Sequence, residues 1–504
     1  MKKKYGEAVN DLLKDDSFTI TGGKRISSTK FAEIVGIKDY YGLLGVRNDA
    51  ELEIIVRRLG DYIKREDVLR ENQDLAEALG VLGDSNNRLL YDEKLQMYKE
   101  VFIQAVKLRS FRFLALGGAS EIGRSSYYVK VGEDNYFLLD MGVKLGGQGK
   151  LPYYYVLKEL PQVKAVFISH AHLDHWGLLR ELKAGGLRNY LGNPLPPIIA
   201  SGETKRQIEI MLGDDVNRGK LSSSERNEIL DSISVSVEGK IDSVSYRLLN
   251  SGHIRGSSMI LLEADGDSLL YTGDINLEDN EITRSATPLA YTVNTVITEA
   301  TYVGHERKEN YEERRKKFIE LVGKAVSEHK KVLIPTFAVQ RTELVLTILS
   351  RAIKKKLLQF NGKIYAAGLG AVMTNMFKTE ELEQVDFSFL VDRENAIKRL
   401  KEILWSDQPQ IIVSTDATMT YGISSELIID ALQMKNAVIV LVGHQFEGTI
   451  GRLLQQALKS RKIKIGDEEF EVYSEIKRID LGAHASEDDL IEFLKKLGAK
   501  NVII

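Results

Sequence analysis

The segment FISHAHLDHWGLL, residues 167–179, holds three of the eight histidines of the chain and one aspartate within six consecutive residues. Residues 162–169 (QVKAVFIS) are apolar and rich in β-branched side chains, so they predict a short strand running into this cluster. In an extended chain, side chains two residues apart point to the same face. The spacing therefore allows His170, His172 and Asp174 to face one point.

His175 follows where the chain must turn, because a helix is expected from Trp176 onward. Zinc accepts histidine nitrogen and carboxylate oxygen, and a hydrolytic zinc site keeps one coordination position open for water. The alternatives are an accidental imidazole run on a surface loop and a buried core histidine. Four ligand-type side chains cost too much to desolvate together without a cation, so we predict a metal site, with room for a second metal beside the first.

Five further acidic or imidazole side chains terminate apolar strands elsewhere in the chain. They are Asp140 in YFLLDMG, His253 in NSGHIRGSS, Asp274 in LLYTGD, Glu299 in TVITEATY and His484 in RIDLGAHAS. Each one alone could be a turn residue or a helix cap. Because all of them end strands rather than project from helices, we expect them to share one rim above a sheet.

The elements that must position these residues fall into three regimes. Residues 1–110 are charged and helix-like, whereas from Phe111 short apolar strands alternate with glycine-rich turns, which is typical of a sheet-rich α/β domain. From about Tyr302, helices alternate with strands such as VLIPTF and QIIVST, and this order predicts a doubly wound parallel sheet. After about Lys462 short strands return, followed by a helix (EDDLIEFLKKLG) and a last strand (KNVII).

Composition sets outer limits on function. A chain of 504 residues accommodates about three domains. The absence of cysteine excludes disulfides and thiolate zinc sites, and it fits the cytoplasm that we expect as location. No signal peptide and no stretch of about eighteen apolar residues is present, so we expect no membrane association. The net charge of -3 gives no global attraction to nucleic acid, so a polyanionic substrate needs a local basic groove.

The motifs DMG, SHAHLDH, SGHIRGSSM, YTGD, EATY, PTFAVQR, GHQFEGTIGR and GAHAS, in this order, resemble the β-CASP branch of the metallo-β-lactamase fold. That family includes ribonuclease J and the endonuclease subunit of the cleavage and polyadenylation factor. The resemblance covers residues 111–504 and implies an α/β fold: a metallo-β-lactamase αββα sandwich with an inserted doubly wound α/β β-CASP domain. The implied boundaries are 111–301 and 473–504 for the sandwich and 302–472 for the insertion.

Carried over residue by residue, the resemblance implies a zinc-dependent nuclease. The implied ligands of two zinc ions, with Mn²⁺ or Mg²⁺ as alternatives, are His170, His172 and His253 for one ion, Asp174 and His175 for the other, and Asp274 bridging both. The implied catalytic residues are Asp174, Asp140, which would orient ligands and the nucleophile, and His484, polarised by Glu299 as general acid. A two-metal-activated water would then hydrolyse RNA or single-stranded nucleic acid and leave a 5′-phosphate and a 3′-hydroxyl.

Two departures from the family pattern matter. The family continues after its last strand into a VHGE-like turn whose histidine completes the second metal site, whereas this sequence stops at KNVII, so we expect a weaker second zinc or a ligand from a partner or solvent. His305, His329 and His444 are poor substitutes by sequence. Asp416, in STDATMTYG, stands where the family reads TSGM followed by GG, and it is expected to weaken or alter a phosphate contact.

The first hundred residues raise a separate question. KDYYGLLGVRNDA and ALGVLGDSNNRLLYDEKLQMY resemble the first and last helices of a DnaJ-type J-domain, which implies a small J-like helical domain over residues 38–110. The His-Pro-Asp loop of active J-domains is replaced by IKREDVLREN, so we expect a docking module for a protein partner without co-chaperone activity. A generic helical hairpin is the alternative, and residues 1–37 stay unassigned.

Several hypotheses about function stay open at this point. The first is a ribonuclease; a DNA nuclease of the same family is the second, because its DNA-repair members lack histidine at the last motif. The third is a catalytically silent scaffold in a nucleic-acid processing or defence complex, which is disfavoured because inactive members lose metal ligands. A small-molecule hydrolase would have no use for the inserted domain. A homodimer is compatible with the sequence.

Overall fold

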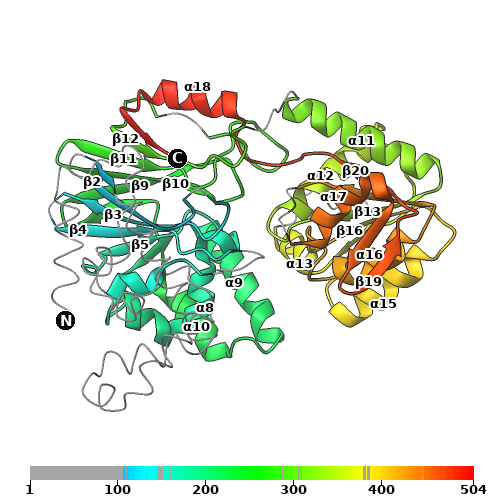
Figure 1. Cartoon of the computed structure of the whole chain (residues 1–504), viewed down its shortest axis with the longest axis horizontal. Helices are drawn as coiled ribbons and strands as arrows, with labels where there is room; N and C mark the ends of the chain where they lie inside the picture. Colours follow the sequence, from blue (N-terminus) through cyan, green and yellow to red (C-terminus); the bar gives the residue numbers. More distant parts are fainter. Residues whose placement is uncertain are drawn as a thin grey trace, which may run out of the picture.

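The described part of the chain folds into two lobes, one built on two large sheets and one on a single large sheet (Figure 1). The computed structural model describes residues 106–108, 111–119, 121–132, 134–144, 151–158, 160–286, 289–304, 307, 309–377, 382, 386–443, 445 and 448–504. The first lobe ends with strand β12 and resumes near the C-terminus, so the second lobe is an insertion into the first.

The first sheet of the larger lobe has seven strands in the order of the chain, β1 to β7. They are Val106–Leu108, Phe111–Gly117, Ser126–Val131, Asn135–Leu139, Ala165–Phe167, Ile198–Ala200 and Ile233–Val235. Strands β1 to β4 pair antiparallel, and β4 to β7 pair parallel. The carboxyl ends of β4 and β5 therefore reach the same edge, and Asp140 and the histidine cluster directly follow these ends.

The second sheet runs in the order β21-β12-β11-β10-β9-β8. Its strands are Glu238–Ile241 (β8), Val244–Asn250 (β9), Ser258–Ala264 (β10), Asp267–Tyr271 (β11), Thr295–Ile297 (β12) and Asn501–Ile503 (β21). The last strand of the described chain pairs parallel with β12, so it returns to the larger lobe after the insertion. The turns after β9, β11 and β12 carry His253, Asp274 and Glu299.

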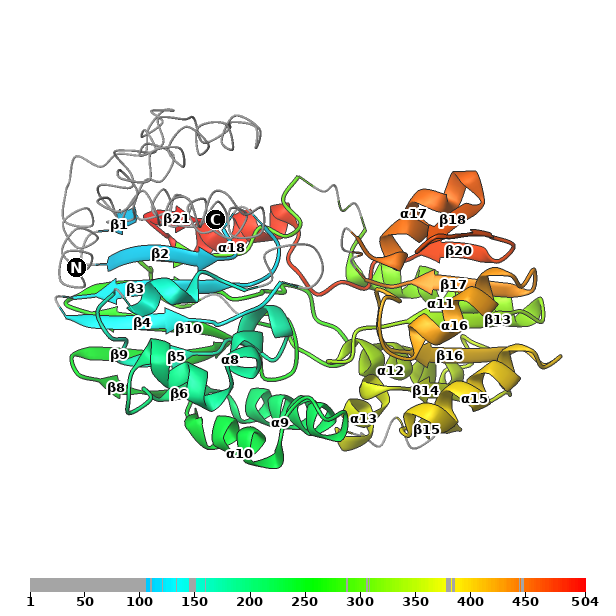
Figure 2. The same cartoon turned by 60° about the horizontal axis from the view of Figure 1, so that its bottom comes forward.

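Side chains along each strand alternate between the two faces of the sheet, and this alternation allows the lobe to pack in four layers. Phe113 and Ala115 of β2 pack between the two sheets, whereas Leu114 and Leu116 face outward against helices. The outer helices on that side are α8 (Leu173–Leu191), α9 (Gly202–Asn217) and α10 (Ser223–Ser232), together with the short η1 (Tyr154–Lys158). On the other side, α18 (Glu487–Leu497) covers the second sheet, so the lobe is an αββα sandwich (Figure 2).

The inserted lobe contains one six-stranded sheet in the order β15-β14-β16-β13-β17-β20, and every pairing in it is parallel. Its strands are Lys331–Pro335 (β13), Ile364–Ala367 (β14), Phe387–Leu390 (β15), Gln410–Ser414 (β16), Ala437–Leu441 (β17) and Glu475–Arg478 (β20). The helices around it are α11 (Tyr311–Ser327), α12 (Arg341–Lys354), α13 (Leu369–Met376), α15 (Arg393–Leu404), α16 (Ser424–Leu432) and α17 (Ile450–Ser460). A hairpin of β18 (Lys462–Ile465) and β19 (Glu468–Glu471) follows α17.

The predicted fold class is confirmed for the sandwich and for the doubly wound insertion, and details differ. Strand β20 pairs with β17, so the inserted sheet continues beyond the expected boundary at residue 472. The predicted J-like domain over residues 38–110 lies outside the described residues except for Val106–Leu108, and residues 1–37 lie outside them entirely. Those three residues pair with β2 as a strand, which corrects the helix-like expectation for this end of the region. Among the described residues, no helix combines the length and apolarity needed to span a bilayer.

Candidate metal centre

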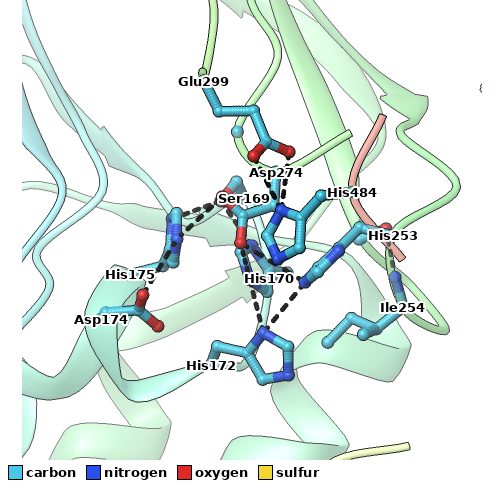
Figure 3. Close-up of polar contacts among 12 residues, drawn as sticks. Ser169, His170, His172, Asp174, His175, His253, Ile254, Asp274, Glu299 and His484 are labelled. Atoms are coloured by element: carbon cyan, nitrogen blue, oxygen red, sulfur yellow. Dashed lines mark hydrogen bonds and ion pairs between the residues drawn. The ribbon is translucent and has the colours of Figure 1, made fainter. Parts of the chain in front are cut away.

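Four side chains from three separate turns point their ligand atoms at one another (Figure 3). His170 Nε2 and His253 Nε2 each lie 3.1 Å from His172 Nδ1. Asp274 Oδ2 lies 3.6 Å from His170 Nε2 and 3.4 Å from His253 Nε2. Ligands at about 2.0–2.1 Å from a tetrahedral zinc ion stand roughly 3.3 Å apart, so these separations fit one such ion.

A second group of ligand atoms adjoins the first. His175 Nε2 lies 3.3 Å from Asp274 Oδ1 and 3.9 Å from Asp174 Oδ2. Asp274 thus directs one carboxylate oxygen to each group, which is the arrangement that a bridging ligand requires. The predicted strand over residues 162–169 is shorter than expected, Ala165–Phe167, and helix α8 already begins at Leu173. Asp174 therefore reaches the site from the first turn of a helix and not from an extended chain.

The lone pairs of the histidines are aimed by hydrogen bonds on their other ring nitrogens. His175 Nδ1–H donates to Asp140 Oδ2 at 2.7 Å, and His253 Nδ1–H donates to the carbonyl oxygen of Ala483 at 2.6 Å. The hydroxyl of Ser169 donates to Asp140, so it accepts from His170 Nδ1 at 3.0 Å. In each case the hydrogen bond holds the ring with Nε2 directed at the site, as metal-ligating histidines require.

Asp140 is the centre of this supporting network. Its side chain is fully buried, and it accepts four hydrogen bonds of 2.7 Å, from Ser169 N, Ser169 Oγ, His175 Nδ1 and Tyr271 Oη. Asp140 also has a positive φ of 61°, a backbone conformation that aspartate tolerates better than most residues. Ser169 and Tyr271 open the motifs SHAHLDH and YTGD, but sequence reasoning assigned neither of them a role in the site.

The protonation states favour a cation. Burial lowers the pKa of His172 to about 3, and burial together with neighbouring imidazoles holds the pKa values of His170 and His253 well below their usual range. These rings are therefore neutral. Burial also acts to lower the pKa of His175, but the carboxylates around it, Asp274 first, raise it well above the usual range. The three neutral imidazoles therefore present lone pairs beside the Asp274 carboxylate, and a divalent cation would bind to such a donor set.

His484 and Glu299 stand beside the first ligand group. His484 Nδ1–H donates to Glu299 Oε2 at 2.7 Å and lies 3.0 Å from Oε1, while Oε1 also accepts from Ile275 N at 2.7 Å. Burial acts to lower the pKa of His484, and the Glu299 carboxylate outweighs it, so the pKa is raised. The imidazolium form is thus favoured with Nε2–H on the side away from Glu299.

The site opens into a cleft of about 1630 Å³ between the two lobes. His172, Asp174, His175, His253, Asp274, Glu299 and His484 line it together with residues of the inserted lobe. Arg255 Nη2 of the sandwich donates to Glu343 Oε1 of the inserted lobe at 2.6 Å, next to the site. The two segments that connect the lobes are bonded to each other, since Arg307 Nη2 donates to Asp480 Oδ2 at 2.9 Å. These joining residues were not predicted, because such contacts leave no local pattern.

The other histidines of the sequence do not join this group where they are described. His329 ends helix α11 with an exposed ring. His305 and His444 lie outside the described residues. Asp416 lines the cleft, and its carboxylate accepts from Thr418 N at 3.0 Å and from the Thr418 hydroxyl. Burial raises the pKa of Asp416.

Comparison with known proteins agrees with this architecture. Residues 120–186 match the metallo-β-lactamase superfamily, and residues 342–454 match the β-CASP domain. The chain is 28% identical to transcription termination factor FttA of Methanothermobacter thermautotrophicus, over 77% of this chain and 65% of that protein. It is 29% identical to probable RNase MJ4 of Methanocaldococcus jannaschii, over 77% and 91%, and 25% identical to endoribonuclease YSH1 of Eremothecium gossypii, over 78% and 54%.

The chain thus spans less than two thirds of the length of two of these three relatives. The two matched regions lie in different lobes: residues 120–186 in the sandwich with the histidine cluster, and residues 342–454 in the doubly wound lobe. The ligand groups sit where the two lobes meet, at the edge that the sandwich presents to the insertion. The protein is therefore built from a metallo-β-lactamase domain that carries an inserted β-CASP domain.

Proposed function

We propose that this chain is a divalent-metal-dependent nuclease that hydrolyses phosphodiester bonds of single-stranded RNA. The observation that carries the proposal is the placement of Asp274 between two groups of ligand atoms at the base of an interdomain cleft, with the His484–Glu299 pair beside them. Two relatives, a probable RNase and an endoribonuclease, support RNA as the substrate class.

The donor sets fit two ions. His170, His172, His253 and Asp274 would hold the first, and Asp174, His175 and Asp274 the second. Zinc is the metal that these nitrogen and oxygen ligands suit, and Mn²⁺ or Mg²⁺ are the alternatives. When bound, such ions supply Lewis-acid activation of water and of the phosphate.

The protein's own groups supply the proton chemistry. Asp140 keeps Nε2 of His175 free by accepting its other N–H, so the ligand geometry is set before substrate arrives. Glu299 stabilises the imidazolium of His484, whose Nε2–H is the proton that the leaving oxygen would receive. The cleft leaves the first ligand group accessible to an extended strand, because His172 and Asp274 are only partly buried.

The test combines metal content with cleavage of end-labelled single-stranded RNA and DNA by the purified full chain. His172→Ala removes the ligand atom that contacts both His170 and His253, so we expect loss of metal and of cleavage without unfolding. His329→Ala, at an exposed helix end, is the matched control and should leave both unchanged. Metal-independent cleavage, or full activity of His172→Ala, would contradict the proposal; preferential cutting of DNA would correct its substrate class.

A further inference from the structure

Arg341 is a buried cation on the wall of the cleft. It is the first residue of helix α12 and leaves only 6% of its surface exposed. Its Nη1 donates to the carbonyl oxygen of Leu481 at 2.9 Å, three residues before His484. Arg341 lines the same cleft as His172 and His484, and it is close enough for its charge to act on both rings.

Arg341 differs from the other cations of the cleft in its lack of an anionic partner. Four further lysines and arginines line the cleft, and each pairs with a carboxylate: Lys144 with Glu121, Arg180 with Glu181 and Asp215, Arg218 with Asp214, and Lys220 with Asp215. Within the described part of the chain, no carboxylate lies within ion-pair distance of Arg341. The Asp480 carboxylate acts on Arg341 only from beyond ion-pair distance and is itself paired with Arg307. A buried guanidinium without a carboxylate in direct contact is costly, so this position favours an anion supplied from the cleft.

The remaining donors of Arg341 are available for that anion. A guanidinium carries five N–H donors, and the bond to Leu481 uses one of them. Buried nitrogens without a partner occur in Arg255, Arg307 and Arg314, but Arg341 has none, so its other nitrogens are in contact with the solvent of the cleft. The planar fork of a guanidinium matches two oxygens of a phosphate.

We propose that Arg341 binds a backbone phosphate of the substrate, either the scissile phosphate or its immediate neighbour on the His484 side. The inserted domain thereby contributes a substrate-binding residue to a centre whose ligands all come from the sandwich. This inference rests on the proposed function, since it names the contact by which the same site holds a nucleic acid.

Arg341 could instead serve only to hold the loop that carries His484 in place. Arg307 is the matched comparison for that role, because it also donates to a backbone carbonyl of this loop. Arg307 Nη1 donates to the carbonyl oxygen of His484 at 2.9 Å, and its Nη2 pairs with Asp480. It is similarly buried, at 8% side-chain exposure, but it does not line the cleft. Replacing Arg307 should loosen the loop without removing a phosphate contact.

The experiment measures binding of fluorescein-labelled single-stranded RNA by anisotropy over a range of salt concentrations. The zinc-loaded full chain carries His484→Ala, so that the expected proton donor is absent and the RNA stays intact. Arg341→Gln, which can still donate to Leu481, should weaken binding about tenfold and reduce the slope of log K against log salt by about 0.7, the loss of one phosphate contact on a single strand. Arg341→Lys should recover part of the affinity, and Arg307→Gln should leave the salt slope unchanged.

A second arm locates the contact. In a set of RNAs, one linkage at or next to the cleavage position is replaced in turn by a neutral methylphosphonate. One of these RNAs should bind to the parent about tenfold more weakly than the unmodified RNA. The same RNA and the unmodified RNA should bind equally well to Arg341→Gln. An unchanged salt slope in Arg341→Gln, together with a thermal destabilisation like that of Arg307→Gln, would overturn the phosphate role and leave only loop bracing. A parent that binds neither RNA nor DNA would instead overturn the proposed function, and this inference with it.

Discussion

Replacing Asp140 by asparagine tests whether the carboxylate under the metal centre sets the geometry of the ligands. The change keeps the shape of the side chain but removes one acceptor oxygen and the charge. Ser169 N donates to Oδ1 and His175 Nδ1 donates to Oδ2, so the amide NH₂ of an asparagine must face one of these two donors. The hydroxyls of Ser169 and Tyr271 can rotate, but the backbone N–H cannot.

The magnitude follows from these bonds. A hydrogen bond to a charged group contributes about 1.5–3 kcal/mol, and a buried donor left unpaired costs about as much again, so Asp140→Asn should lower the free energy of unfolding by about 3 kcal/mol. If His175 rotates to escape the conflict, its Nε2 no longer faces Asp274; if it changes tautomer instead, Nε2 carries the proton and cannot bind a cation. Groups that support metal ligands typically change metal affinity by about 10–100-fold, and the second ion should be the one affected.

The assay pairs urea unfolding of the metal-free chain with competitive zinc titration against a chromophoric chelator. Tyr271→Phe is the matched control, because it removes one of the four donors to Asp140 and leaves the carboxylate in place. It should cost about 1–2 kcal/mol and leave zinc affinity within a few-fold. The reasoning is refuted if Asp140→Asn binds two zinc ions as tightly as the parent chain, or if Tyr271→Phe does equal damage.

Three further predictions concern packing, charge and pH. Gly142→Ala would place a methyl group 1.6 Å from the carbonyl oxygen of Asp174, so the backbone under α8 must move, and urea unfolding should show a loss of about 3 kcal/mol. Glu343→Gln leaves Arg255 with a neutral partner across the domain boundary; a loss of about 2 kcal/mol is expected by the same measurement, below the cost for a fully buried pair because Arg255 is 29% exposed. Burial acts to raise the pKa of Asp480, but its partner guanidinium outweighs burial and the pKa is lowered. The ionised carboxylate of Asp480 therefore stabilises the fold above the unfolded-state pKa, and this stabilisation is lost as pH falls below about 4. In Asp480→Asn, the free energy of unfolding should consequently fall less steeply at low pH, in the acid limb of its curve against pH.

Two of these changes have a control variant within the chain, and Asp480→Asn is compared with the parent chain. Gly213, inside helix α9, has open space around the added methyl group, so Gly213→Ala should stabilise by about 0.5–1 kcal/mol. Glu312→Gln removes an exposed pair with Arg315 and should change stability by less than about 1 kcal/mol. Equal losses in test and control variants, or parallel acid limbs for Asp480→Asn and the parent chain, would show that the named contacts are not responsible.

The sequence was most informative where buried strands end in acidic or imidazole residues. The strands around Phe137, Phe167 and Leu270 are fully buried, so their apolar runs are unbroken and their last residues point to the site. Strands β7 and β8 were missed, because they lie at sheet edges and carry mostly exposed side chains. β15, another edge strand, is only half-buried and was missed for the same reason.

The supporting groups of the site escaped prediction for a different reason. Ser169 and Tyr271 act through hydrogen bonds to Asp140 across 29 and 131 residues of sequence, and the motifs that they open do not reveal this shared partner. The start of helix α8 was predicted at Trp176, three residues too late. The alternate spacing of His170, His172 and Asp174 fits a strand, whereas Leu173 and Asp174 are equally compatible with the first turn of a helix. The order of the motifs identified which residues meet, while hydrogen bonds between distant segments determine how they are aimed.

The start of helix α12 explains why the inserted domain matters to a centre whose ligands it does not provide. Three of the four residues 340–343 at this start contact the two loops that carry His253 and His484. Gln340 and Glu343 accept from Arg255, and Arg341 donates to Leu481. His253 in turn donates to Ala483, so the two loops are also bonded to each other. A displacement of the inserted domain would therefore shift a metal ligand, the expected proton donor and the proposed phosphate contact together.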